Sequence, residues 1–288
     1  MSAHTLERRL RRMAEDMKRP LASACGLSKE YLRGSKSESE RCAAQCAKPR
    51  LLDLFCCEGG AGKGYADAGF EVLGVDLLPQ PRYPFEFQQM DALSIDPQWI
   101  ADNFDAVHAS PPCQGYSVSK NAHKTSNHPM LVEPTRALLK AAGVPYIIEN
   151  VVGAPLEAPI LLCGTMFGLS TADDDGEPLI LRRHRLFESS LWINAPTHCI
   201  CADLKARGFR VAGAYGGGSV NKVHAKNVRH GGYTPSKARR VELIGADWMT
   251  LHGLSQSIPP AYTEWIGRQI LAAIIIGSTL AQGRPLLW

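Results

Sequence analysis

From Arg50 onward the chain alternates between short apolar runs and segments with helical periodicity. The apolar runs at 51–55, 70–75, 106–109 and 144–149 predict strands. The segments that follow, above all 62–68 and 130–142, predict helices, and one further strand is expected to end near Asp91. Strands that alternate with helices predict a mostly parallel sheet of the doubly wound α/β class, with ligand sites at the carboxyl ends of the strands.

Two parts of the chain lack this rhythm. Residues 4–19 carry apolar side chains on one helical face and precede a polar linker at 34–49. Residues 188–240 are glycine-rich and irregular, and an acidic turn at 171–178 comes shortly before them. We expect three regions: an N-terminal arm (1–49), an α/β domain (50–187 with 241–288) and a small inserted region (188–240). An apolar helix at 265–280 is expected to close the α/β domain.

The composition argues against a membrane-spanning or secreted protein. The chain has 288 residues, of which 45% are hydrophobic, and no apolar run reaches the length of a membrane span. Its nine cysteines lack the spacing of a disulfide framework, so we expect a cytoplasmic protein, in a bacterium or a phage-infected host, rather than a secreted one.

The net charge of +4 is unevenly distributed. Residues 1–50 carry 12 Lys or Arg against 6 acidic residues, and residues 201–240 carry 9 against one. The rest of the chain is therefore acidic. Basic segments on an acidic body are typical of proteins that bind polyanions, although a solvated basic loop would also explain 201–240.

Candidate chemistry gathers at the predicted strand ends. Cys113 follows Ser110-Pro111-Pro112, and a cysteine presented by such a turn is suited to be a nucleophile. Glu149 ends the next predicted strand, and Arg183 and Arg185 stand at the start of another. The first strand leads into a glycine-rich turn and a helix, a common site for a nucleotide-like cofactor. A nucleophile, an acid and two cations in this order are expected to share one pocket.

In this order, Pro-Cys-Gln, Glu-Asn-Val, Arg-x-Arg and the glycine loop resemble the DNA cytosine-5 methyltransferases, in the small, linear-order form found in bacteria and phages. The resemblance runs from about 51 to 270. It implies a class I S-adenosylmethionine-dependent methyltransferase fold, S-adenosylmethionine as cofactor and double-stranded DNA as partner, with 188–240 as the target-recognition region. It also implies a monomer that flips the target base out of the duplex and serves a restriction-modification system or a phage.

For the cofactor, the resemblance implies that Phe55 packs on the adenine, that Asp76 accepts from the ribose and that Asp91 accepts from the adenine amino group. Cys57 stands where the family usually has Gly, and Gln256 where it usually has Asn. An enlarged pocket at Cys57 would also admit a sulfonium carrying a group other than methyl. The full expected set is Asp53, Phe55, Gly59, Gly60, Asp76, Leu77, Asp91, Ala92, Pro112, Gln256 and Ser257.

For catalysis, the resemblance implies that Cys113 adds to carbon 6 of cytosine while Glu149 gives a proton to N3. Arg185 would hold the base O2, and Arg183 would support the loop that carries Cys113. The thiol would be activated either by a lowered pKa or by proton transfer during attack. The expected DNA contacts are Gln114, Ser117, Lys222, Lys226, Arg229, Lys237 and Arg239, with base discrimination by Asn221, His224 or Asn227.

Several alternatives stay open. Ser-Pro-Pro also resembles the start of the amino-methyltransferase motif, so N4-cytosine or N6-adenine transfer is one, and carbon-5 transfer to RNA is another. A catalytically silent DNA-binding regulator is a third, and residues 21–33 have the pattern of either a helix-turn-helix or a plain helical cap. We predict no metal, because Cys199-x-Cys201 is not the usual Cys-x2-Cys spacing of zinc ligands. The alternative is a zinc site formed by His198, Cys199 and Cys201, with Cys163 nearby.

Overall fold

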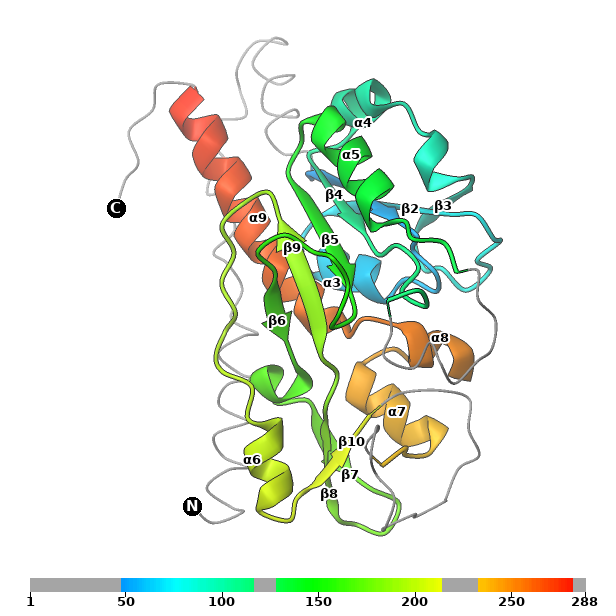
Figure 1. Ribbon diagram of the computed structural model, residues 1–288, viewed down its shortest axis with the longest axis vertical. Helices are drawn as coiled ribbons and strands as arrows, with labels where there is room; N and C mark the ends of the chain where they lie inside the picture. Colours follow the sequence, from blue (N-terminus) through cyan, green and yellow to red (C-terminus); the bar gives the residue numbers. More distant parts are fainter. Residues whose placement is uncertain (1–47, 117–127, 214–232, 282–288) are drawn as a thin grey trace, which may run out of the picture.

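The computed structural model describes residues 48–116, 128–213 and 233–281 (Figure 1). Its main sheet has the strand order β3-β2-β1-β4-β5-β9-β6. The first five of these strands run parallel, and β9 is antiparallel to both β5 and β6. The strands in chain order are β1 (Arg50–Leu54), β2 (Glu71–Asp76), β3 (Glu86–Gln89), β4 (Ala106–Ala109), β5 (Tyr146–Asn150), β6 (Ile160–Leu162) and β9 (Arg185–Ser189).

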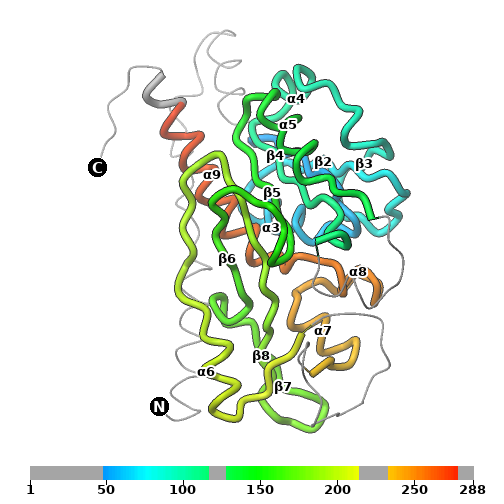
Figure 2. Tube along the Cα trace, in the orientation of Figure 1, coloured from blue at the N-terminus to red at the C-terminus, as the bar shows by residue number. Residues whose placement is uncertain are grey.

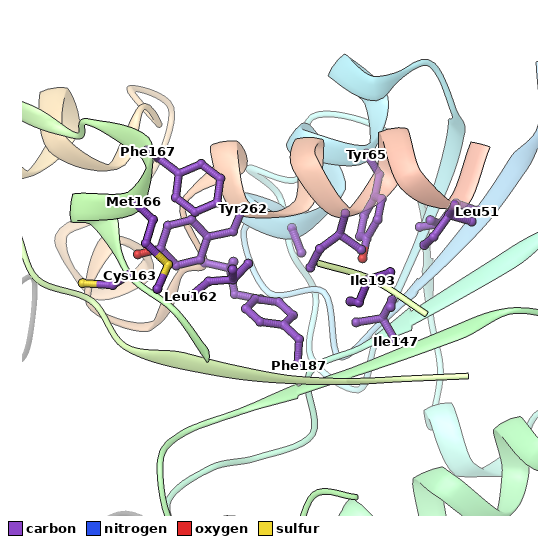
Figure 3. Packing of buried hydrophobic residues seen from close by; sticks show 14 of the residues in the cluster. Leu51, Tyr65, Ile147, Leu162, Cys163, Met166, Phe167, Phe187, Ile193 and Tyr262 are labelled. Atoms are coloured by element: carbon purple, nitrogen blue, oxygen red, sulfur yellow. The ribbon is translucent and has the colours of Figure 1, made fainter. Parts of the chain in front are cut away.

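Helices cover both faces of this sheet, because its strands point apolar side chains to each face. Leu51 points to the face covered by α3 (Gly60–Ala68) and α9 (Pro260–Ala281), which pack along each other (Figure 2). Leu52 points to the other face, covered by α4 (Pro97–Asn103) and α5 (Val132–Ala142). The first core continues through Phe187 and Tyr262 toward the smaller part of the molecule (Figure 3).

That smaller part is built on a second sheet with the order β10-β8-β7. Its strands β7 (Ser170–Ala172) and β8 (Pro178–Leu181) flank the predicted acidic turn, and β10 (Arg210–Ala212) pairs with β8. The predicted recognition region 188–240 thus shares a sheet with residues that the sequence assigned to the α/β domain. Its helices are η4 (Gly164–Phe167), α6 (Cys201–Ala206), α7 (Lys237–Ile244) and α8 (Leu251–Gln256).

The predicted α/β architecture with a mostly parallel sheet is confirmed. The strand predicted at 106–109 has the predicted bounds, and the last helix begins at Pro260, five residues before its predicted start. The N-terminal arm was predicted at 1–49, and residues 1–47 of it lie outside the described residues. Within the described residues, no helix is both long and apolar enough to cross a membrane.

Candidate active site

The predicted motifs meet at one edge of the main sheet. β1 pairs with β2 and β4, and β4 pairs with β5, all in parallel, so the carboxyl ends of these four strands lie next to one another. The last residues of these strands include Asp76 and Glu149, and the loops that follow β1 and β4 carry the glycine turn and Cys113. Side chains separated by almost a hundred residues therefore face a common region, as expected for this class of sheet.

The turn after β1 has an unusual backbone. Phe55 and Cys57 adopt left-handed conformations, with φ of 58° and 47°, which glycine adopts more readily than other residues. The N–H of Cys57 donates to Asp76 Oδ2 at 3.0 Å, and that of Leu78 donates to Asp76 Oδ1 at 3.0 Å. Asp76 therefore fixes the turn that a cofactor would approach, and each of its oxygens keeps a further lone pair for a ligand.

Asp53 is the most unusual carboxylate of this edge. Its side chain is fully buried, and Oδ2 accepts a hydrogen bond from the hydroxyl of Tyr83 at 3.0 Å. Oδ1 has no hydrogen-bond partner among the described residues. Burial raises the pKa of Asp53 to about 7, although the hydrogen bond from Tyr83 opposes that rise. An orphaned buried oxygen beside a glycine turn indicates a missing donor, which a bound ligand would supply.

The C-terminal motif packs on the glycine turn. A Cβ atom on Gly60 would lie 2.5 Å from the carbonyl oxygen of Ile258, so only glycine allows this approach. Glu58 joins the same two segments, because its carboxylate accepts from the N–H of Thr250 at 2.7 Å and from its hydroxyl at 2.6 Å. Gln256 is exposed and Ser257 is buried at this junction.

Arg183 is fully buried and donates to the carbonyl oxygens of Ser257 and Ser255, at 2.7 and 2.8 Å. These bonds tie the start of β9 to the loop between α8 and α9. The assignment of Arg183 to the support of the Cys113 loop stays a prediction; these two hydrogen bonds reach the C-terminal loop. Arg183 is thus a positioning residue for the motif that packs on the glycine turn.

Cys113 lies half-buried after the Pro-Pro turn. The turn is held by the fully buried Asn150, whose side-chain amide donates to the carbonyl oxygen of Pro111 at 2.9 Å. Burial and the nearby carboxylate of Glu149 raise the pKa of the Cys113 thiol, against the lowering effect of Arg185. Of the two predicted routes of activation, this favours proton transfer during attack over a thiol that is ionised beforehand.

Glu149 and Arg185 form a buried ion pair, with Arg185 Nε 2.9 Å from Glu149 Oε1. Oε1 is buried, and apart from this ion pair it has no hydrogen-bond partner among the described residues. Burial raises the pKa of Glu149, while Arg185, Arg183 and a hydrogen bond with Ser110 lower it. Desolvation is the largest of these effects, which keeps a proton on Glu149 to a higher pH than on an exposed glutamate.

A chain of hydrogen bonds leads away from this pair. Ser110, bonded to Glu149, lies with Oγ 2.8 Å from His108 Nε2, and His108 Nδ1 lies 3.0 Å from the hydroxyl of Tyr65. Burial lowers the pKa of His108 to about 3, so its ring is neutral near pH 7 and bridges two hydroxyls. Sequence reasoning assigned no role to Asn150, His108 and Tyr83; a polar residue inside an apolar strand is the signal for the first two, and no sequence signal marks Tyr83 in the connection between β2 and β3.

The other predicted cofactor residues lie at the same edge. Asp91 caps η2 (Ala92–Ser94) through a bond from the N–H of Leu93, and Ala92 is buried behind it. Leu77 is 65% exposed just after β2, so it is available to a ligand. Gly59 is buried, and Pro112 is half-buried beside Cys113.

The predicted DNA contacts are only partly placed. Gln114 and Lys237 are exposed. Arg239 pairs with Asp174 at 3.0 Å and with Glu242 at 2.9 Å, which neutralises most of its charge. The remaining predicted contacts, together with the base-reading candidates, lie outside the described residues: Ser117, Lys222, Lys226, Arg229, Asn221, His224 and Asn227.

The cysteines near the start of α6 lie in a cluster that differs from the set considered in the sequence. Cys163, Cys199 and Cys201 do come together, but the histidine beside them is His184, from the Arg-x-Arg motif. His198 is exposed and is not part of the cluster. Proximity along the chain pointed to the wrong histidine, because β9 brings His184 to the cluster from fifteen residues away.

No protein-family model matches the chain. A curated relative, the type II methyltransferase M.AgeI of Thalassovita gelatinovora, is 28% identical over 120 residues, which are 36% of this chain and 28% of the relative. The chain thus spans little more than a quarter of that relative's length.

Among solved structures, the Dnmt2 methyltransferase of S. pombe matches with a TM-score of 0.50 and 10% identity, over 79% of this chain and 99% of that one. The Entamoeba histolytica methyltransferase EhMeth covers the same shares at 14% identity, with a TM-score of 0.48. The chain therefore has the fold of the class I S-adenosylmethionine-dependent methyltransferases, and the orphaned oxygen of Asp53 beside the glycine turn supports S-adenosylmethionine as its cofactor.

Proposed function

We propose that this chain methylates carbon 5 of cytosine in duplex DNA through a covalent adduct with Cys113. The observation that carries the proposal is the buried pair of Glu149 and Arg185, whose charges both act on the Cys113 thiol. A thiol, a carboxyl group whose pKa is raised by burial and a cation are what addition to a pyrimidine ring requires. Transfer to an exocyclic amino group needs neither Cys113 nor Glu149.

S-adenosylmethionine supplies the methyl group as an electrophile bonded to a positively charged sulfur. The residues at the strand ends fit its polar groups. Asp53 offers its unpartnered Oδ1 to the ammonium of the methionine part, Asp76 offers lone pairs to the ribose hydroxyls, and Asp91 accepts from the adenine amino group. Leu77 and Phe55 provide apolar surface for the adenine ring.

The protein's own groups then activate the base. The Cys113 sulfur bonds to carbon 6 as its proton passes to water, and the electron pair that develops at N3 takes the proton of Glu149. Arg185 steadies the carboxylate that Glu149 becomes, so charge is stabilised where it forms. After methyl transfer to carbon 5, water takes the proton on carbon 5, the Cys113 sulfur leaves carbon 6 as a thiolate, and N3 returns its proton to Glu149, which restores the aromatic ring. The target carbon is covered in a stacked duplex, so the base must be flipped out first.

The distribution of basic residues favours a nucleic acid as the substrate. The basic segment 201–240 and exposed residues such as Lys237 favour a polyanion, and phosphate contacts supply much of the affinity for DNA. The type II methyltransferase named above favours DNA with a short target sequence and a restriction-modification or phage setting. RNA is the second candidate, since the same carbon-5 chemistry serves either nucleic acid.

The test is a product analysis on duplex DNA and on transfer RNA offered side by side with S-adenosylmethionine. Digestion and mass spectrometry distinguish 5-methylcytosine from N4-methylcytosine and N6-methyladenine. We expect 5-methylcytosine in DNA from the wild type and from Cys42→Ser, a control cysteine outside every motif, and none from Cys113→Ala. DNA with 5-fluorocytosine, whose fluorine cannot leave, should trap a covalent complex. Undiminished product from Cys113→Ala would overturn the mechanism, and preference for RNA would overturn the substrate.

A further inference from the structure

Four metal-ligating side chains meet at a single point beside the start of β9, next to the arginines of the candidate active site. They are Cys163, His184, Cys199 and Cys201, and their ligand atoms all lie within 4.8 Å of one another. Three segments contribute: Cys163 follows β6, His184 precedes β9, and the two remaining cysteines lead into α6 (Figure 1). Such a junction between elements is a common place for a structural metal.

The distances within the cluster are close to those of a coordination shell. His184 Nε2 lies 3.3 Å from Cys199 Sγ and 3.4 Å from Cys201 Sγ, and the two sulfurs lie 3.3 Å apart. Around a tetrahedral zinc, with bonds of about 2.0–2.3 Å, ligand atoms are separated by about 3.5–3.8 Å. These three separations need to lengthen by only a few tenths of an ångström, and a separation at the 4.8 Å limit of the cluster would need to shorten by about 1 Å to hold an ion.

We propose that Cys163, His184, Cys199 and Cys201 bind one structural Zn²⁺. Three thiolates and an imidazole nitrogen form the Cys₃His set that selects zinc among the common divalent ions, and such closed sites leave no position for substrate. Cys163 is fully buried and Cys201 is 6% exposed, so the site is shielded from solvent on those sides.

The surroundings of the cluster suit thiolates. Thr165 donates its hydroxyl to Cys199 Sγ at 3.6 Å and its backbone N–H to Cys163. Arg182 lies near Cys201, where its positive charge offsets the net charge of −1 that three thiolates, a neutral histidine and Zn²⁺ would carry. Hydrogen bonds and charges of this kind orient metal ligands and tune their affinity. Three cysteines that served only as core packing would have no need of them.

The site has a consequence for the active site. His184 stands between Arg183, which holds the C-terminal loop, and Arg185, which pairs with Glu149. An ion bound to His184 would fix the start of β9 and with it both arginines. The zinc proposal itself does not depend on the proposed function, because metal content can be measured whether or not the protein is active.

Elemental analysis of the full chain, purified without chelators under reducing conditions, tests the proposal. We expect one zinc per chain in the wild type and in His198→Ala, the control that removes the neighbouring exposed histidine. We expect loss of zinc in His184→Ala and Cys199→Ser. His184→Cys should restore a bound ion, and replacement by Co²⁺ should then give the absorption bands of an all-sulfur tetrahedral site in place of those of a three-sulfur, one-nitrogen site.

A second readout keeps the test independent of folding in the variants. A strong chelator should lower the Tm of the wild type and expose cysteines to a thiol reagent, and added Zn²⁺ should reverse both effects. A wild-type protein that holds no metal and takes up neither Zn²⁺ nor Co²⁺ after reduction would overturn the proposal. Full occupancy in His184→Ala with loss in His198→Ala would overturn the ligand set.

Discussion

Arg185 Nε lies 2.9 Å from Glu149 Oε1, and both side chains are more than nine-tenths buried. The guanidinium lowers the pKa of a carboxyl group that burial raises. In the proposed mechanism only protonated Glu149 is active, so the rate of the covalent step should fall as pH rises through the raised pKa. Removing the positive charge in Arg185→Leu should move this fall to higher pH, whereas Arg185→Lys should leave it nearly in place.

Glu149→Gln provides the companion measurement. An amide can hydrogen-bond to N3 but cannot give it a proton, so we expect a loss of about 10²–10⁴-fold in rate. The fall that belongs to Glu149 should vanish from the pH profile of this variant. A Glu149→Gln profile that keeps the same fall would assign it to another group.

Ser110 should affect the pKa of Glu149 less than Arg185 does. Its hydroxyl lies 2.8 Å from His108 and bonds to Glu149, whose pKa it lowers. Ser110→Ala should therefore shift the fall in rate to higher pH in wild-type background, by less than Arg185→Leu does. Ser110→Thr, which keeps the hydroxyl, is the control. Equal profiles in wild type and Ser110→Ala would show that the hydrogen bond plays no part in catalysis.

Asp53 predicts a pH-dependent cofactor affinity. Its pKa is raised to about 7, so below that pH the free enzyme holds a proton that an ammonium donor would displace. The affinity for S-adenosylmethionine should rise with pH up to about 7 and then level off, with proton release on binding measured by calorimetry in two buffers. Asp53→Asn should abolish this pH dependence, and Asp76→Asn should weaken binding but keep it.

The same shift has a consequence for stability. Because the folded-state pKa of Asp53 is above its value of 3.8 in the unfolded chain, the folded form binds the proton more tightly. Its ionisation therefore costs stability, with no cost below about pH 4 and the full cost above about pH 7. Thermal unfolding without cofactor should show that Asp53→Asn gains on the wild type as pH rises across this window.

Gly60 predicts a purely steric effect. An added Cβ would lie 2.5 Å from the carbonyl oxygen of Ile258 and 3.1 Å from Ser257, so Gly60→Ala should displace the C-terminal motif. We expect a loss of about 1–3 kcal/mol in the free energy of unfolding, as in other overpacked sites, and weaker cofactor binding. Gly277→Ala, where a Cβ meets nothing within 4 Å, should be neutral or stabilising.

Lys237 and Arg239 should behave differently toward DNA although they are close neighbours. Lys237 is exposed, and Lys237→Ala should flatten the dependence of log affinity on log salt by about one unit of slope. Arg239 is paired with Asp174 and Glu242, so Arg239→Ala should mainly lower Tm. A larger change of salt slope in Arg239→Ala than in Lys237→Ala would restore Arg239 as a phosphate contact.

The sequence predicted the sheet well because strand burial and strand periodicity are local signals. β4 has its predicted bounds, and the meeting of Glu149 with Arg185 was expected from their places at strand ends. Partners chosen by tertiary packing were not predicted. The bonds from Arg183 to the C-terminal loop, the left-handed turn at Cys57 and the choice of His184 over His198 depend on where distant segments dock.

The antiparallel pairing of β5 with β9 holds Glu149 and Arg185 together independently of the segment that connects the two strands. Glu149 lies opposite Phe187 and Asn150 opposite Leu186, so the two strands that carry the ion pair are joined directly by backbone hydrogen bonds. Everything between them, from 151 to 184, is an excursion through β6 and the small sheet. An insertion at the turn 173–176 should therefore lengthen the chain between the two strands, while the register that holds Glu149 beside Arg185 stays as it is.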